Sequence, residues 1–261
     1  MTGQEMYLER GTFFHGLDPR TKVLTLVTLF VVILYFDNPL WIAPVSLLVL
    51  LHAIASRSMG NLRPVRYILF VLGLSSVILW NVFAHGTTPL FWLIKRESFS
   101  YSIGRTLILL SLVVEGIVFL STTRHEELTL GLIRLGLPYR VGFAISTAFR
   151  MIPMIVASAY AVAQAQRSRG LDLDTGNIVN RVKKYLPLLV PVFLSMIRST
   201  NTFVMALESR GFGLRRKRTF YLQIRLTRDD ILCMATLLLL FGAATYFKLA
   251  GYGMIAGLRR F

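Results

Sequence analysis

The 261-residue sequence is 54% hydrophobic and only 16% charged, and its mean hydropathy is +0.60. A water-soluble core of this size does not bury so much apolar surface, so soluble globular folds are disfavoured. The 29 Lys and Arg residues outnumber the 13 Asp and Glu residues, which leaves a net charge of +16. Such an excess suits nucleic acid, anionic membrane surfaces or acidic partners. In a chain this apolar, basic cytoplasmic loops that orient membrane spans are the first explanation.

Individual residue types argue against a metal site, a disulfide framework and a signal peptide. Cys233 is the only cysteine, so neither a disulfide nor a cysteine-based zinc site forms within one chain. The four histidines, at positions 15, 52, 85 and 125, lack the spacing that places two ligands on one helix face. No metal ligands are therefore assigned. The first 22 residues carry six charged side chains and no apolar stretch, so no cleavable signal peptide is expected.

Five apolar runs approach the length that crosses a bilayer, about 20 helical residues. Asp37, Asn38 and Pro39 separate the first two runs and predict a tight turn, because proline disfavours helix in the residue before it. A small hairpin or an interfacial loop is expected between the third and fourth runs, at residues 86–102. The five predicted spans are residues 23–36, 40–55, 67–84, 106–123 and 231–247.

The long insert at residues 124–228 resembles neither a set of spans nor an ordinary hydrophilic domain, because its 17 Lys and Arg residues accompany apolar helical sequence. Helical spacing of apolar residues predicts one short and two long helices, at residues 126–135, 142–170 and 183–211. Ala157, Ala161 and Ala165 lie one turn apart and favour close approach of another helix. The chain therefore divides into a part with four spans, the insert and a C-terminal span, at residues 1–123, 124–228 and 229–261.

The distribution of basic residues predicts the orientation of the spans. If the N-terminus is inside, the cytoplasmic segments hold 23 of the Lys and Arg residues and the opposite side holds 6. Cytoplasmic loops carry such an excess, so the N-terminus and the insert are expected to be cytoplasmic. The insert helices are expected to lie along the inner membrane face, too apolar for solvent and too basic to cross. The side of the C-terminus stays open, because residues 249–258 fit either a longer last span or a segment on the membrane surface.

The insert contains one tripeptide twice, at the C-terminal ends of its two long predicted helices. The copies are Ser168, Arg169, Gly170 and, 41 residues later, Ser209, Arg210, Gly211. Glycine ends a helix in the left-handed conformation, and arginine before it lies where the helix dipole favours positive charge. Two ordinary helix C-caps are one explanation. The other is that each guanidinium, held on a rigid helix end, forms paired hydrogen bonds with a partner's carboxylate.

Several polar residues in the apolar helices and at their ends receive structural interpretations. Arg150 precedes Pro153 and is expected to stabilise the bend in its helix. Glu115 lies in the middle of the fourth predicted span, where a carboxylate is either functional or a packing partner. Packing against Asn81 or another polar neighbour is favoured. The basic run at residues 215–218 predicts a membrane-facing turn rather than a nucleic-acid site.

The two Ser-Arg-Gly sequences and several other short sequences, in fixed order, resemble the EcfT/CbiQ family. Its members are transmembrane coupling (T) subunits of energy-coupling factor (ECF) transporters for vitamins and metals. The resemblance covers nearly the whole chain, and one departure is serine where the family often has alanine before Arg-Gly. The matching sequences outside the first tripeptide lie at residues 17–22, 122–128, 149–153, 206–213 and 218–219.

The resemblance implies an all-α polytopic membrane protein with about five transmembrane helices plus long cytoplasmic coupling helices that cross. It implies that each Arg-Gly tip docks into one of two ABC-type ATPase subunits, while the same helices contact a substrate-binding S component in the cell membrane of a prokaryote. ATP-driven movement would pass through the crossed helices for uptake of a vitamin or a transition-metal ion.

This chain would then be a non-catalytic subunit that binds no cofactor, while the partner ATPases bind ATP and Mg. The sequence agrees, because it contains no Gly-x-x-x-x-Gly-Lys-Ser/Thr loop that could hold ATP phosphates. The expected partners are the two ATPases, the S component and the lipid membrane, with no nucleic acid.

A self-contained secondary transporter, or another ABC-type permease, is the alternative to a coupling subunit. Secondary transporters often contain inverted repeats with equal numbers of spans, whereas here four predicted spans precede the insert and one follows it. A polytopic membrane enzyme acting on lipid phosphates would need clustered acidic or histidine residues, and those residues are few and dispersed. The coupling-subunit interpretation is therefore preferred.

Overall fold

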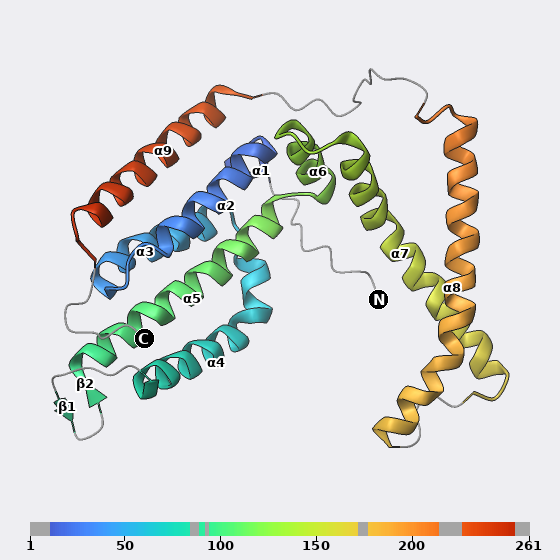
Figure 1. The fold of residues 1–261 in the computed structure, drawn as a ribbon, viewed down its shortest axis with the longest axis horizontal. Helices are drawn as coiled ribbons and strands as arrows, with labels where there is room; N and C mark the ends of the chain where they lie inside the picture. Colours follow the sequence, from blue (N-terminus) through green and yellow to red (C-terminus); the bar gives the residue numbers. More distant parts are fainter. Residues whose placement is uncertain (1–10, 84–88, 92–93, 172–176, 214–225, 254–261) are drawn as a thin grey trace. The chain divides into compact units, whose positions relative to one another are not determined.

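The computed structural model describes residues 11–83, 89–91, 94–171, 177–213 and 226–253. These residues form nine helices and one small two-stranded hairpin (Figure 1). The chain divides into two compact units. One unit, the α7–α8 pair, contains α7 (Tyr139–Ser168) and α8 (Ile178–Ser209). The other unit, the bundle, contains the remaining elements.

The bundle is built around α5, which packs against α2, α3 and α4. Its elements are α1 (Phe13–Gly16), α2 (Pro19–Ile33), α3 (Pro39–Ala55), α4 (Met59–Phe83), β1 (Pro89–Phe91), β2 (Ile94–Lys95), α5 (Arg96–Thr122), α6 (His125–Arg134) and α9 (Arg228–Leu249). The antiparallel pairing of β1 with β2 shows that the connection between α4 and α5 contains the small hairpin that the sequence predicted as one of two options.

Side chains before the first turn fix where α2 and α3 begin. The Asp18 carboxylate accepts a hydrogen bond from Arg20 N at 2.9 Å, and proline is the first residue of α2. Asn38 caps α3 in the same way, with Pro39 as the first helical residue. These caps combine an acceptor for a free N–H group with the fixed φ of proline. The predicted turn at Asp37–Pro39 is therefore confirmed.

Apolar packing and small polar pairs together join the bundle helices. Buried aliphatic side chains of α2, α3 and α5 form the core, including Leu29, Val32, Ile33, Ile42, Val49, Val114 and Val118. The Ser111 hydroxyl on α5 donates to Ser46 Oγ on α3 at 3.0 Å, and Thr106 Oγ1 donates to Ser76 Oγ on α4 at 3.1 Å. Small hydroxyl residues let apolar helices approach closely while their polar groups are satisfied.

Helices α2 and α9 run in the same direction, so both begin at one end of the bundle and both finish at the other. At one end, the Lys22 end, the start of α9 contacts the start of α2 through Asp230 and Asp18. At the other, the Asp37 end, Gly253 O accepts hydrogen bonds from Asp37 N and Asn38 N, both at 3.1 Å. The last described residues thus fold back onto the turn between α2 and α3.

Aromatic side chains gather at the Asp37 end. Trp41 packs against Phe247 and Tyr252, with ring centroids 5.2 and 5.5 Å apart. The Arg105 guanidinium is 3.2 Å from the Asp37 carboxylate and lies against the ring of Tyr101. Aromatic rings with a polar edge favour the boundary between membrane and water.

The predicted helices all occur, but the predicted set of spans changes in the structure. Proline starts and sharp turns limit α2 and α3 to 15 and 17 residues. The helices with the length and composition of a membrane span are Met59–Phe83, Glu97–Thr122, Tyr139–Ser168, Lys184–Ser209 and Arg228–Leu249. Each of the two long insert helices contains an apolar stretch of span length, so composition alone does not keep them from crossing; their position along the inner membrane face stays a prediction.

We expect Gly104→Ala to destabilise the bundle by about 1–3 kcal/mol, the usual range for overpacking. A Cβ atom at this position of α5 would overlap the carbonyl oxygen of Asp37. At Gly116, on the same helix, an added Cβ would have no neighbouring atom within 4 Å, so Gly116→Ala is the matched control. Thermal unfolding in detergent checks both, and equal midpoints for the two variants would contradict the close approach.

Candidate functional site

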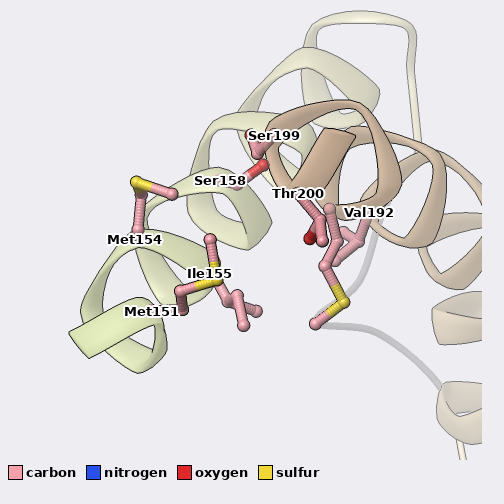
Figure 2. A pocket seen from close by; sticks show the side chains of 8 residues that line it. Met151, Met154, Ile155, Ser158, Val192, Ser199 and Thr200 are labelled. Atoms are coloured by element: carbon pink, nitrogen blue, oxygen red, sulfur yellow. The ribbon is translucent and has the colours of Figure 1, made fainter. Parts of the chain in front are cut away.

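The α7–α8 pair is antiparallel and its helices cross near their middles. The two hydroxyl oxygens of Ser158 on α7 and Ser195 on α8 are 2.8 Å apart. Figure 2 shows that methionine and small polar side chains of both helices meet around this point. They line a narrow pocket of about 20 Å³, formed by Met151, Met154, Ile155, Ser158, Val192, Met196, Ser199 and Thr200.

The alanine row predicted to meet another helix does not make this crossing. Ala157, Ala161 and Ala165 are exposed, whereas Ile155 and Ser158 face α8. The face of α7 that meets α8 instead includes Met151, Ile155 and Ser158. The alanine row therefore stays an exposed strip of small side chains on this unit.

Both long helices end in the same left-handed glycine motif. Gly170 has a φ of +87°, and the next residue, Leu171, donates its N–H to Gln166 O at 3.0 Å. Gly211 has a φ of +70°, and Phe212 N donates to Leu207 O at 3.0 Å. In this motif the N–H of one residue donates to the carbonyl five positions earlier, which satisfies a carbonyl group of the last helical turn. The C-cap interpretation is confirmed for both tripeptides. The motif is formed by backbone groups alone and does not involve the arginine side chains.

Arg169 and Arg210 are exposed at opposite ends of the pair. Neither guanidinium makes a hydrogen bond or an ion pair with the part of the chain that the structure describes. Eleven residues separate Arg169 from the crossing and fifteen separate Arg210 from it. At 1.5 Å per helical residue, the two positions are at most about 40 Å apart. The pair therefore presents two separate cationic tips.

The Arg210 tip is held against the start of α7 by aromatic packing. Phe212 follows the second tripeptide, and its ring centroid lies 4.3 Å from that of Phe143 and 6.4 Å from that of Tyr139. These contacts close the end of the pair opposite the connection between α7 and α8. They also fix the direction in which α8 ends, because Phe212 is part of the terminal turn itself.

The structure locates Arg150 and Pro153 on α7 but shows no contact between Arg150 and a bend. Pro153 lies within the helix, where its ring removes one backbone hydrogen bond. Arg150 is exposed and makes no hydrogen bond or ion pair to any described residue. A stabilising role for Arg150 therefore stays a prediction, while Pro153 explains a local weakness of α7 by itself.

Glu115 pairs with a histidine that the sequence did not indicate as its partner. Its carboxylate oxygen lies 3.1 Å from His52 Nδ1 on α3, and the Glu115 side chain is 1% exposed. The sequence suggested packing against Asn81 or another polar neighbour; Asn81 lies on α4 and is not this partner, and His52 is the other polar neighbour. The pairing follows from the packing of α3 on α5, which periodicity does not reveal.

His52 also lines an apolar groove along α2, α3 and α9. The groove has a volume of about 310 Å³, and Phe14, Leu29, Leu51 and Leu237 are among the side chains that line it. The Phe14 ring packs on the imidazole of His52 with centroids 4.6 Å apart. Among the described residues, no cluster of three His, Cys, Asp or Glu side chains is arranged to hold a metal.

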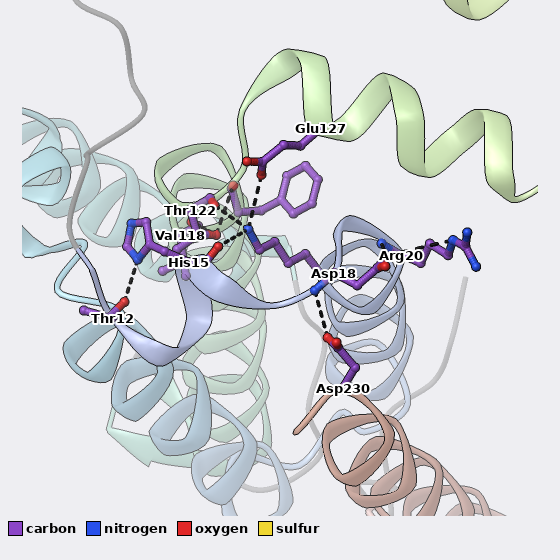
Figure 3. A network of polar contacts seen from close by, with 10 residues as sticks. Thr12, His15, Asp18, Arg20, Val118, Thr122, Glu127 and Asp230 are labelled. Atoms are coloured by element: carbon purple, nitrogen blue, oxygen red, sulfur yellow. Dashed lines mark hydrogen bonds and ion pairs between the residues drawn. The ribbon is translucent and has the colours of Figure 1, made fainter. Parts of the chain in front are cut away.

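A buried lysine at the Lys22 end joins three elements (Figure 3). Lys22 Nζ donates to His15 O at 2.9 Å and to Thr122 O at 2.8 Å, and lies 3.6 Å from the Glu127 carboxylate. The Lys22 side chain is only 4% exposed. Burial lowers the pKa of the ammonium group, and the charge of Glu127 opposes that shift. The sequence placed Lys22 in a matching segment but gave it no role.

A second polar contact lies beside it and involves the start of α9. One oxygen of Asp230 accepts hydrogen bonds from Asp18 N at 2.8 Å and Thr21 Oγ1 at 3.1 Å. The other oxygen accepts from Thr227 N at 2.8 Å and from its hydroxyl at 2.6 Å. Asp230 therefore caps its own helix and holds the start of α2 with the same carboxylate.

Comparison with known proteins gives one family match and a consistent set of relatives. The family described as cobalt transport protein (CbiQ) matches residues 10–221. A protein of Streptococcus thermophilus is 26% identical over 257 residues, which cover 90% of this chain and 94% of the relative. A protein of Ruminiclostridium cellulolyticum is 29% identical, with 87% and 89% covered. One of Lactococcus lactis is 28% identical, with 90% and 93% covered. All three are named energy-coupling factor transporter transmembrane protein EcfT.

We expect Ser158→Cys combined with Ser195→Cys to form a disulfide, because the two side-chain oxygens are 2.8 Å apart. The background is Cys233→Ser, which removes the native cysteine. Ser168→Cys with Ser209→Cys is the control pair, since these positions lie at opposite ends of the pair. Mobility on non-reducing gels checks the result, and an intramolecular bond only in the control pair would contradict the crossing.

A double-mutant cycle on His52→Ala and Glu115→Ala is expected to give an interaction energy of about 0.5–2 kcal/mol. Each single change leaves a buried polar group without its partner, so the double variant is less destabilised than the sum. The free energies of unfolding are measured in detergent micelles. Strict additivity would show that the observed contact does not stabilise the bundle.

Proposed function

We propose that this chain, which belongs to the cobalt transport protein (CbiQ) family, is the membrane-embedded coupling subunit of an energy-coupling factor importer. The family match includes both long helices. The observation that carries the proposal is the crossed α7–α8 pair, with an arginine at each far end that binds no described residue. A subunit that transmits movement from two ATPases needs two such contact points and a rigid connection between them.

Each arginine tip is proposed to dock into one of two ABC-type ATPase subunits. The glycine motif ends the helix and satisfies its last carbonyl groups, so Arg169 and Arg210 project from rigid ends. A guanidinium fits a carboxylate with two parallel hydrogen bonds, which fixes direction as well as contact. The proposed partners therefore carry an acidic groove that receives a helix end.

Movement of the two ATPases is proposed to change the angle between α7 and α8. ATP and Mg bind in those partner subunits, and this chain performs no chemistry itself. Because both tips lie on one crossed pair, displacement of either tip is passed through the contact at Ser158 and Ser195. A displaced tip thus moves the apolar sides of both helices.

The exposed apolar sides of this pair are proposed to contact a substrate-binding S component and the lipid membrane. Large exposed apolar surfaces mark interaction sites. On α8 they include Leu186, Leu189, Val190, Phe193, Leu194 and Ile197. The S component would bind the vitamin or transition-metal ion, and the groups that choose the substrate would lie there.

The Lys22 end of the bundle is proposed to face the cytoplasm of a prokaryotic cell. Basic residues concentrate near this end, whereas the described ones towards the other end are Lys95, Arg96, Arg105 and Lys248. Those near the Lys22 end include Arg20, Arg57, Arg63, Arg66, Arg124 and Arg134. The aromatic cluster around Trp41 would then lie at the outer membrane boundary.

Arg169→Ala combined with Arg210→Ala is expected to leave the chain inserted while abolishing stable ATPase association. Each charge-assisted contact contributes about 1.5–3 kcal/mol, so each single change should weaken binding by roughly 10- to 100-fold. Arg198→Ala is the matched control, because Arg198 is also exposed on α8 but lies near the crossing. Co-purification with the ATPases and ATP-dependent uptake in vesicles are the measurements.

Full ATP-dependent uptake by the double variant would contradict the docking of the tips. The alternative of a self-contained transporter is tested by the purified chain alone in vesicles. Uptake driven by an ion gradient, without any ATPase, would replace the coupling proposal with that alternative.

A further inference from the structure

The polypeptide connects the bundle to the α7–α8 pair at two places. The outgoing connection runs from the end of α5 through α6 to Tyr139. The returning connection reaches the bundle at Thr227, just before α9. Both places contact one short segment, residues 18–22, which we call the anchor segment. Figure 3 shows Asp18 between Asp230 on one side and the Lys22 contacts on the other.

The outgoing connection is held by Lys22 and by a close helix contact. Lys22 Nζ binds the carbonyl of Thr122, the last residue of α5, and lies 3.6 Å from Glu127 in the first turn of α6. A positive charge is favoured at the C-terminal end of a helix. Gly131 of α6 lies so close to Pro19 that an added Cβ would be 3.0 Å from the proline side chain. The first two turns of α6 are therefore fixed to the start of α2.

The returning connection is held by Asp230. The residue is fully buried, and its two carboxylate oxygens accept four hydrogen bonds, from Asp18, Thr21 and Thr227. Hydrogen bonds to an ionised group are about twice as strong as neutral ones, and more so away from water. The start of α9 is therefore fixed to the same segment as the start of α6.

From this arrangement we infer that the anchor segment holds both connections of the α7–α8 pair still while the pair moves. The inference rests on the proposed function. If either connection yielded, displacement of the arginine tips would be absorbed by tilting of α6 or α9. With both connections bonded to one segment, the displacement is delivered to the partner on the apolar face instead. Lys22 and Asp230 are thus positioning residues for coupling rather than contacts to any partner.

A purely structural role makes a different prediction. Loss of stability lowers the amount of intact complex, so ATP hydrolysis and uptake fall together. Loss of the anchor leaves ATP hydrolysis in place but reduces the uptake that each hydrolysed ATP supports. The number of ATP molecules consumed per substrate molecule transported therefore separates the two roles.

The experiment uses the complete complex in vesicles, with this chain, its ATPases and its S component. Lys22→Met removes the charge and keeps the chain length, and Asp230→Asn keeps the shape of the carboxylate. Arg105→Met is the matched control, because it removes the ion pair with Asp37 at the opposite end of the same bundle. ATP hydrolysis, uptake and the thermal midpoint are measured on the same preparations.

The anchor variants are expected to raise ATP consumption per transported molecule about fivefold or more, within the usual range of coupling effects. Arg105→Met is expected to keep the ratio of the unchanged chain, whatever its thermal midpoint. Glu127→Gln, which weakens one contact of Lys22, provides a milder variant if Lys22→Met fails to assemble.

An unchanged ratio in the anchor variants would overturn the inference, as would an equal rise in Arg105→Met. Failure of all anchor variants to assemble while Arg105→Met assembles would assign them a structural role and also overturn it. Failure of the proposed function appears separately, because the unchanged chain would then not associate with ATPases at all.

Discussion

One buried ammonium group organises the Lys22 end of the bundle. The Lys22 side chain is buried away from water. Two carbonyl oxygens and a carboxylate offset the loss of hydration of its charge. Those three groups belong to α1, the end of α5 and the start of α6. A lone methyl group in its place would leave the carbonyls and Glu127 without this partner. Lys22 therefore fixes the junction between α5 and α6 against α1.

The two units differ in how far they bury their apolar side chains. In the bundle, the core side chains of α2, α3 and α5 are buried against one another, and hydroxyl pairs such as Ser46 with Ser111 satisfy the polar groups between them. In the α7–α8 pair, the residues at the crossing are only partly buried, and long apolar sides stay exposed. A pair with so little internal contact needs lipid or protein around it, which agrees with the family to which the chain belongs.

Much of the fold was predictable because helices leave a local pattern in the sequence. Apolar runs located the helices, and Asp37, Asn38 and Pro39 located a turn by local chemistry alone. Helix ends at Gly170 and Gly211 were equally local. The pairing of His52 with Glu115 and the bonds of Lys22 join residues 63 and 100 positions apart, so they depend on which helices are neighbours. Periodicity carries no such information, and it did not say which face of α7 meets α8.

The methionines at the crossing have a mechanical consequence. Met151, Met154 and Met196 line the pocket beside Ser158 with unbranched thioether chains that change rotamer at little energy. The branched side chains of Ile155, Val192 and Thr200 line the same pocket, so the methionines supply the adjustable part of its lining. Under the proposed change of angle between α7 and α8, the methionines can change rotamer and keep the crossing filled. Side chains of this kind are compatible with the proposed movement, and the hydroxyl pair marks the register in which α7 meets α8.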